Sequence, residues 1–70
     1  MIMNDEQTEE FLKDGGILLK YSYSESKGHL IEKKTIIVDW HIHLIVESKH
    51  IAEELIDLLV KNHPDKFQKA

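Results

Sequence analysis

The sequence predicts a small α+β domain in which a helix, a two- or three-stranded antiparallel sheet and a second helix follow one another. Residues 17–24 and 35–46 alternate in the way that half-buried strands do. Residues 48–62 repeat apolar side chains at helical spacing. Gly15-Gly16 and a turn-like stretch at 24–28 separate the first three elements. A sheet with one apolar face and two helices to cover it gives a two-layer domain.

The length of 70 residues allows one domain, which we expect to span residues 1–70 with loose ends at 1–3 and 65–70. A chain this short buries only about 60% of the surface that its unfolded form exposes, so its core is thin. It has no cysteine, so neither a disulfide nor Cys-bound zinc adds stability. A second chain would supply more burial, and a homodimer is therefore one expectation.

The formal net charge is −4, and all nine basic residues are lysine. Arginine usually provides bidentate contacts to phosphate and guanine, and phosphate neutralisation dominates nucleic-acid affinity. We therefore expect no direct binding of nucleic acid. No apolar run approaches the roughly 18 residues of a membrane span, so no membrane association is expected. The N-terminus lacks the basic start of a signal peptide, which favours a cytoplasmic location.

The first element, within residues 1–14, is expected to be a short helix. Asn4 or Asp5 can cap it, and Gln7 follows Asn4 at the spacing of a capping box. Gly15-Gly16 ends the element. The alternative is a disordered acidic tail.

The strands are expected at 17–24, more weakly at 29–33, and at 35–46, which we interpret as the central strand. Gly28 is free to take a positive φ in the turn between the first two. A single long, bent hairpin arm is the alternative to a break near Lys33-Lys34. The scaffold residues expected from these patterns and from the last helix are Ile36, Val38, Trp40, Ile42, Ile51, Leu55 and Leu59.

The last helix is expected to begin after Ser48, a good N-cap, and to end before Pro64. Ile51, Leu55 and Leu58 recur at helical spacing, so one side of this helix should face the sheet.

The string Asp39-Trp40-His41-Ile42-His43 resembles the D-x-H-x-H strand end of metal-dependent amidohydrolases and related phosphoesterases. Two histidines two residues apart in a strand share a face and can chelate a metal, so His41 and His43 are the weak metal candidates. The barrel of that family needs about 250 residues. We therefore expect surface histidines without a metal, and no cofactor.

Signatures of catalysis are missing from the sequence, which has no activated nucleophile motif and no Gly-rich phosphate loop. A general acid or base needs a shaped, partly dry pocket, for which so thin a core leaves little room. The expectation is a non-enzymatic protein.

The acidic residues gather in the two expected helices. Glu53 and Asp57 are one turn apart, at about 5–6 Å, which is comparable to the spacing of phosphates along a nucleic-acid strand. Two such acidic rows would present a nucleic-acid-like field to a basic protein. The residues expected to bind the partner are Glu6, Glu9, Glu10, Asp14, Glu53, Glu54 and Asp57.

The segments NDEQTEEFLKD and SKHIAEELIDLL, together with the small size and the lack of cysteine and arginine, give the chain a resemblance to a protein family. It resembles the small acidic host-takeover proteins of bacteriophages, some of which are DNA mimics that inhibit the bacterial nucleoid protein HU. The resemblance implies an inhibitor that occludes the DNA-binding site of a basic host protein such as HU, in the host cytoplasm.

Two other functions are open from the residues alone. Ile37 and Ile45 lie on the face of the expected strand that carries His41 and His43, and they favour a homo-oligomeric or adaptor module that uses the exposed sheet face or edge. The third hypothesis is a His-based metal-binding module.

Overall fold

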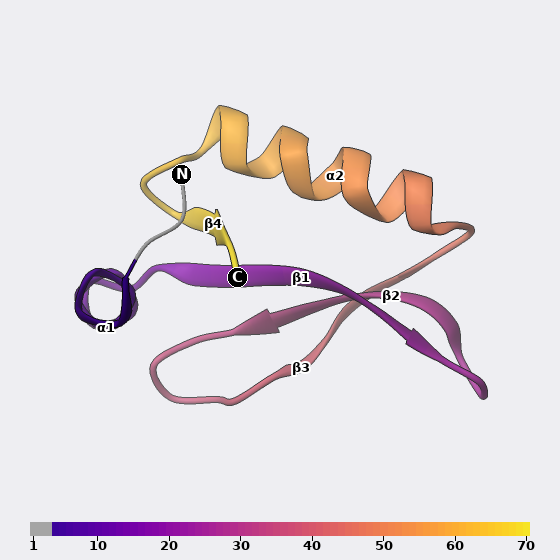
Figure 1. Cartoon of the computed structure of the whole chain (residues 1–70), viewed down its shortest axis with the longest axis horizontal. Helices are drawn as coiled ribbons and strands as arrows, with labels where there is room; N and C mark the ends of the chain where they lie inside the picture. Colours follow the sequence, from indigo (N-terminus) through magenta and orange to yellow (C-terminus); the bar gives the residue numbers. More distant parts are fainter. Residues whose placement is uncertain (1–3) are drawn as a thin grey trace.

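The computed structural model describes residues 4–70. Its elements are α1 (Asp5–Lys13), β1 (Ile17–Ser24), β2 (Gly28–Lys34), β3 (His41–Val46), α2 (Lys49–Asn62) and β4 (Phe67–Lys69). The four strands form one sheet in the order β3-β2-β1-β4, and α2 runs along one of its faces (Figure 1). β1, β2 and β3 are antiparallel, whereas β4 is parallel to β1. The predicted α+β class and the order of helix, strands and helix are confirmed.

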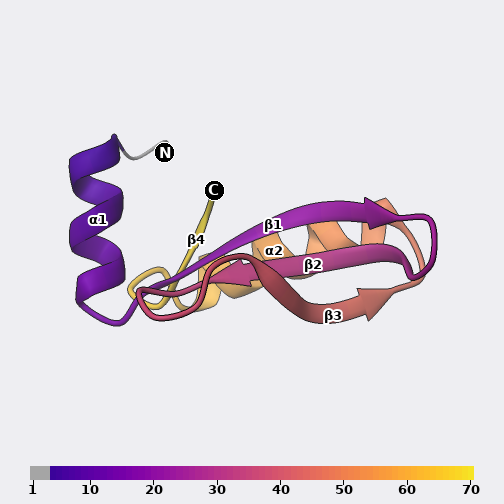
Figure 2. The same cartoon turned by 90° about the horizontal axis from the view of Figure 1, so that it is seen from below.

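Helix α1 forms through the predicted capping box. Asn4 Oδ1 accepts from the Gln7 backbone N–H at 2.8 Å, and Gln7 Oε1 accepts from the Asn4 N–H at 3.2 Å. Gly15 follows the helix with φ of +91°. Only Leu12 of α1 is buried, and the helix stands at one end of the sheet, where it packs against β1 (Figure 2). The expectation that two helices cover the sheet is therefore wrong, because α2 alone does so.

The β1–β2 hairpin matches the predicted strand at 17–24 and extends the weak one to 28–34. Ser24 pairs with Gly28 across the turn, and Gly28 has φ of +84°, which glycine adopts without strain. These two strands, and not residues 35–46, form the centre of the sheet.

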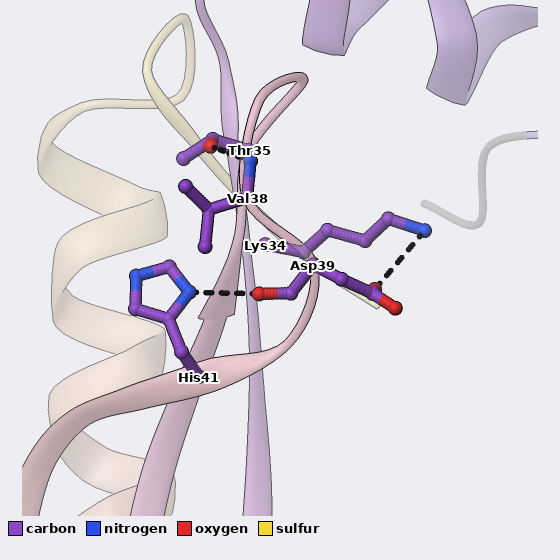
Figure 3. A network of polar contacts seen from close by, with 5 residues as sticks. All are labelled: Lys34, Thr35, Val38, Asp39 and His41. Carbon is purple, nitrogen blue, oxygen red and sulfur yellow. Dashed lines mark hydrogen bonds and ion pairs between the residues drawn. The ribbon is translucent and has the colours of Figure 1, made fainter.

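The long strand expected at 35–46 is wrong in its first half. Thr35 N–H donates to the Val38 carbonyl at 2.9 Å, and Val38 N–H donates to Thr35 Oγ1 at 3.1 Å (Figure 3). A threonine hydroxyl that captures a nearby backbone group competes with strand pairing. The chain therefore turns after β2, and β3 begins only at His41, at the edge of the sheet.

The core lies between α2 and the two central strands. The buried members of this cluster are Leu19, Ile31, Ala52 and Ile56, and three further leucines, Leu12, Leu18 and Leu30, are buried elsewhere. Leu55 and Leu59 pack against it as expected, and Ile51 and Trp40 are half-buried. The expected scaffold residues Ile36, Val38 and Ile42 are instead exposed, because they lie in the turn and on the edge strand.

Helix α2 begins as predicted, since the Ile51 N–H donates to the Ser48 hydroxyl at 3.2 Å. The tail expected to be loose at 65–70 contains β4, so that expectation is wrong for 67–69. Ile17 N–H donates to the Lys66 carbonyl at 2.8 Å, Ala70 N–H donates to the Leu19 carbonyl at 2.9 Å, and Phe67 packs against the core. The expectation for residues 1–3 lies outside the described residues.

Candidate interaction surface

The Asp-x-His-x-His string does not converge on one point. His41 Nδ1 donates to the backbone carbonyl of Asp39 at 2.8 Å, since a carbonyl can only accept. The Asp39 carboxylate is directed instead to Lys34, whose Nζ lies 3.8 Å away (Figure 3). Asp39 and His41 therefore make contacts within the turn between β2 and β3 and not with a common ligand site.

His43 sits beside other cationic or protonatable groups. Its burial, the Lys33 ammonium and the neighbouring His41 all lower the pKa of His43 below its usual value of 6.5. A nearby ammonium that opposes protonation also opposes a metal cation. Across residues 4–70, no group of three or more His, Cys, Asp or Glu side chains is placed to hold a metal ion.

The acidic side chains of α2 alternate with cations. Glu53 lies 3.8 Å from Lys49, Glu54 lies 3.0 Å from His50, and Asp57 pairs with Lys69 of β4. All three ion pairs are solvent-exposed, so each contributes little to stability. They nevertheless place a positive or protonatable group next to each acid of this helix.

The acidic side chains of α1 are exposed, and fewer of them form ion pairs than those of α2 do. Glu9 pairs with Lys13 at 3.8 Å, and within residues 4–70 it is the one α1 acid with an ion pair. α1 is seen end-on in Figure 1 while α2 is seen from the side, so the two axes cross steeply. Among the described elements α1 contacts β1 and not α2. The structure thus brings together the predicted site residues within each helix, and not those of the two helices.

Large exposed apolar side chains lie on both faces of β3 and in the turn before it, since Ile42 and Ile45 are on the face opposite to Leu44. Ile37 is 89% exposed and Ile45 is 59% exposed. We call this set the β3 surface: Ile36, Ile37, Val38, Ile42, Leu44 and Ile45. Ile37 and Ile45 were expected to be exposed, whereas Ile36, Val38 and Ile42 were expected in the scaffold and Leu44 was not singled out.

The outer edge of β3 has no strand beside it in the described part of the chain. β3 pairs with β2 alone, and the backbone hydrogen bonds outside the regular elements involve none of its residues. It carries no Lys, Pro or acidic residue, which are the usual protections of an edge. One feature does interrupt it: Ile31 pairs with Leu44 and Glu32 with Ile42, so His43 is an extra, bulged residue.

Several hollows lie elsewhere on the molecule, among them the following two. One, of about 290 Å³, lies between β1 and α2 and has lysines 20, 49 and 69 in its lining. The other, of about 430 Å³, lies along the side of α2 that carries Ile51, Leu55 and Leu58. His43, whose pKa is lowered, lines neither hollow.

Within residues 4–70, the helices are too short or too polar to cross a membrane. Comparisons of the chain with protein-family models, with curated proteins and with solved structures found no match.

Proposed function

We propose that this chain is a non-enzymatic protein-interaction module that binds another protein chain through the β3 surface. The single observation that carries the proposal is the run of six exposed large apolar side chains between Ile36 and Ile45, which lie in the turn before β3 and on both faces of this open sheet edge. Large exposed apolar patches on small soluble proteins typically mark interaction sites.

The energetics favour covering this surface. Full burial of one Val, Leu or Ile side chain is worth about 1.5–3 kcal/mol. An open strand edge adds backbone groups that a partner strand can pair. A chain whose own buried core is as small as seven hydrophobic residues among 4–70 has much to gain from such a partner.

The proposal is tested by affinity capture from a bacterial lysate with the wild type and two charge variants. Ile45→Lys places an ammonium in the β3 surface, and it should remove the specifically retained proteins. Leu58→Lys is the matched control, because Leu58 is 56% exposed but lies on α2. Specific retention of the same proteins by the wild type and by Ile45→Lys would contradict the proposal.

The second candidate function is the acidic inhibitor of a basic DNA-binding protein such as HU. It is favoured by α1, which stands at the end of the sheet (Figure 2), because Glu6 and Glu10 of this helix and its C-cap Asp14 are exposed. Charge complementarity of this kind speeds association and weakens as salt is added. The ion pairs of Glu53, Glu54 and Asp57 give less support to α2 as part of the same surface.

This candidate is tested by titrating purified HU with the chain at several salt concentrations, with DNA as the competitor. The double variant Glu6→Gln/Glu10→Gln should weaken binding, and Glu53→Gln/Glu54→Gln separates the contribution of α2. An affinity for HU that is independent of salt, or equal in all variants, would exclude DNA mimicry.

A further inference from the structure

We propose that the chain bound at the β3 surface is a second copy of the same protein, with the two β3 strands paired antiparallel and Ile45 at the two-fold axis. This inference rests on the proposed function and adds the identity of the partner. The sheets of the two copies would join into one of eight strands, four from each copy.

The two edges of the sheet differ in a way that selects β3. The opposite edge is formed by β4, which has three residues and carries Lys69, and beyond it by the rest of β1. β3 has six residues without a formal charge apart from its histidines. An edge of this kind pairs with another strand where charge, proline or a bulge does not prevent it, and the bulge at His43 leaves residues 44–46 regular.

Symmetry restricts the register of such a pair. A two-fold axis perpendicular to the sheet keeps each side chain on its own face, and directly opposed residues must share a face. One residue of the strand therefore lies opposite its own copy. The candidates near the middle of β3 are His43, Leu44 and Ile45.

The bulge at His43 distinguishes these registers. Ile42 is level with Glu32, whereas Val46 is level with His29, so Ile42 and Val46 lie on opposite faces. A pair centred on Leu44 would oppose Ile42 to Val46, and the faces would not match. A pair centred on His43 would oppose two imidazoles and would bring Asp39 level with Glu47, which have like charge.

Centring on Ile45 avoids both conflicts. Leu44 is level with Ile31 and Val46 with His29, so Leu44 and Val46 share a face and can lie opposite each other. His43 of each copy is then level with Glu47 of the other, so no two acids are opposed. The regular part of β3 pairs with itself, and Ile45, 59% exposed in one copy, is covered by Ile45 of the other.

A second copy fits this edge better than a charged peptide does. β3 has no formal charge with which a charged peptide could pair, and a second copy of β3 is equally apolar. Of the acids flanking β3, Asp39 is neutralised in part by Lys34, while the acids of α1 lie on a different element. The net charge of −4 therefore opposes the contact only weakly at physiological salt.

Sedimentation equilibrium on the full chain tests the inference. The wild type should show a concentration-dependent dimer, Ile45→Lys should weaken dimerisation by at least tenfold, and Leu58→Lys should leave it unchanged. Circular dichroism establishes that each variant is folded. A wild type that stays monomeric at all concentrations, or a dimer that Ile45→Lys leaves intact, overturns the inference.

A disulfide provides a second readout that remains valid if Ile45→Lys does not fold. Opposed residues of antiparallel strands have Cα atoms about 4.5–5.5 Å apart, within the range that a disulfide spans. Because the chain has no cysteine, Ile45→Cys should give a covalent dimer on mild oxidation, whereas Leu58→Cys should not. Equal cross-linking of both variants overturns the inference. A monomeric wild type that still retains other proteins in an Ile45-dependent manner would overturn this inference alone and leave the proposed function standing.

Discussion

The Nζ of Lys20 lies 4.2 Å from the centroid of the Trp40 ring, which joins the middle of β1 to the end of the turn before β3. A cation over an indole face is worth about 0.5–1 kcal/mol at an exposed site. The contact crosses β2, because β1 and β3 are not neighbours in the sheet. It therefore helps to hold residues 35–40 against the sheet.

Replacing Lys20 by Met should lower the free energy of unfolding by about 0.5–1 kcal/mol, because the aliphatic stem is kept and the cation is lost. Trp40 is the one tryptophan of the chain, so its emission reports this site directly. We expect a red shift as the indole becomes more hydrated. Lys27→Met, in the β1–β2 turn, is the matched control, and an identical spectrum for Lys20→Met and the wild type would refute the contact.

Two isoleucines with different exposure give a direct test of the core. Ile31 is fully buried and Ile37 is 89% exposed. Ile31→Ala should cost about 2–5 kcal/mol through lost burial and a cavity, and Ile37→Ala should change stability by less than about 0.5 kcal/mol. Urea unfolding followed by circular dichroism measures both. Similar losses for the two variants would contradict the placement of residues 35–38 outside the core.

Local signals explain what could be predicted from the sequence. The capping box at Asn4, the N-cap at Ser48 and the glycine at position 28 act through neighbouring backbone groups, so their elements were predicted correctly. The alternation at 35–46 misled, because the hydroxyl of Thr35 closes a turn that the pattern does not encode. Alternation is also the same in edge and central strands, so the position of β3 depended on a strand order visible only in three dimensions.

Only part of the candidate site could be predicted from the sequence. Ile37 and Ile45 were identified because they fall on the polar side of the alternation. Ile36, Val38, Ile42 and Leu44 were missed because their exposure follows from the turn and from the position at the sheet edge. β4 is only three residues long, too short for any periodic signal.

The contribution of β4 is tested through Phe67, which packs against the core from the end of the chain. Phe67→Ala should cost about 2 kcal/mol, less than the roughly 3–5 kcal/mol of a fully buried phenylalanine, since Phe67 is half-buried. Hydrogen exchange should accelerate at two amides that tie this segment to β1. The Ile17 amide donates to the Lys66 carbonyl, and the Ala70 amide donates to the Leu19 carbonyl. Lys27→Ala, in the β1–β2 turn, is the control, and unchanged exchange in Phe67→Ala would mean that Phe67 does not hold β4 on the sheet.

The titration of His43 makes stability depend on pH. Its pKa is lowered in the folded chain by burial, then by Lys33 and then by His41, whereas the unfolded chain retains a value near 6.5. The unfolded chain therefore binds more protons between these two values, and the free energy of unfolding falls as the pH drops from 6.5 through the folded pKa. The stabilising contribution is fully present above 6.5. His43→Gln should flatten this part of the profile of urea midpoint against pH.

NMR titration of the His43 ring tests directly whether Lys33 lowers the pKa of this histidine. Lys33→Gln removes the ammonium and should raise the pKa of His43 toward 6.5, but not fully to it, because burial is the larger cause. Lys27→Gln, at the far end of the β1–β2 hairpin, should leave the titration unchanged. If Lys33→Gln and Lys27→Gln give the same curve, Lys33 does not face the imidazole, and the pH dependence must then arise from the burial of His43 and from His41.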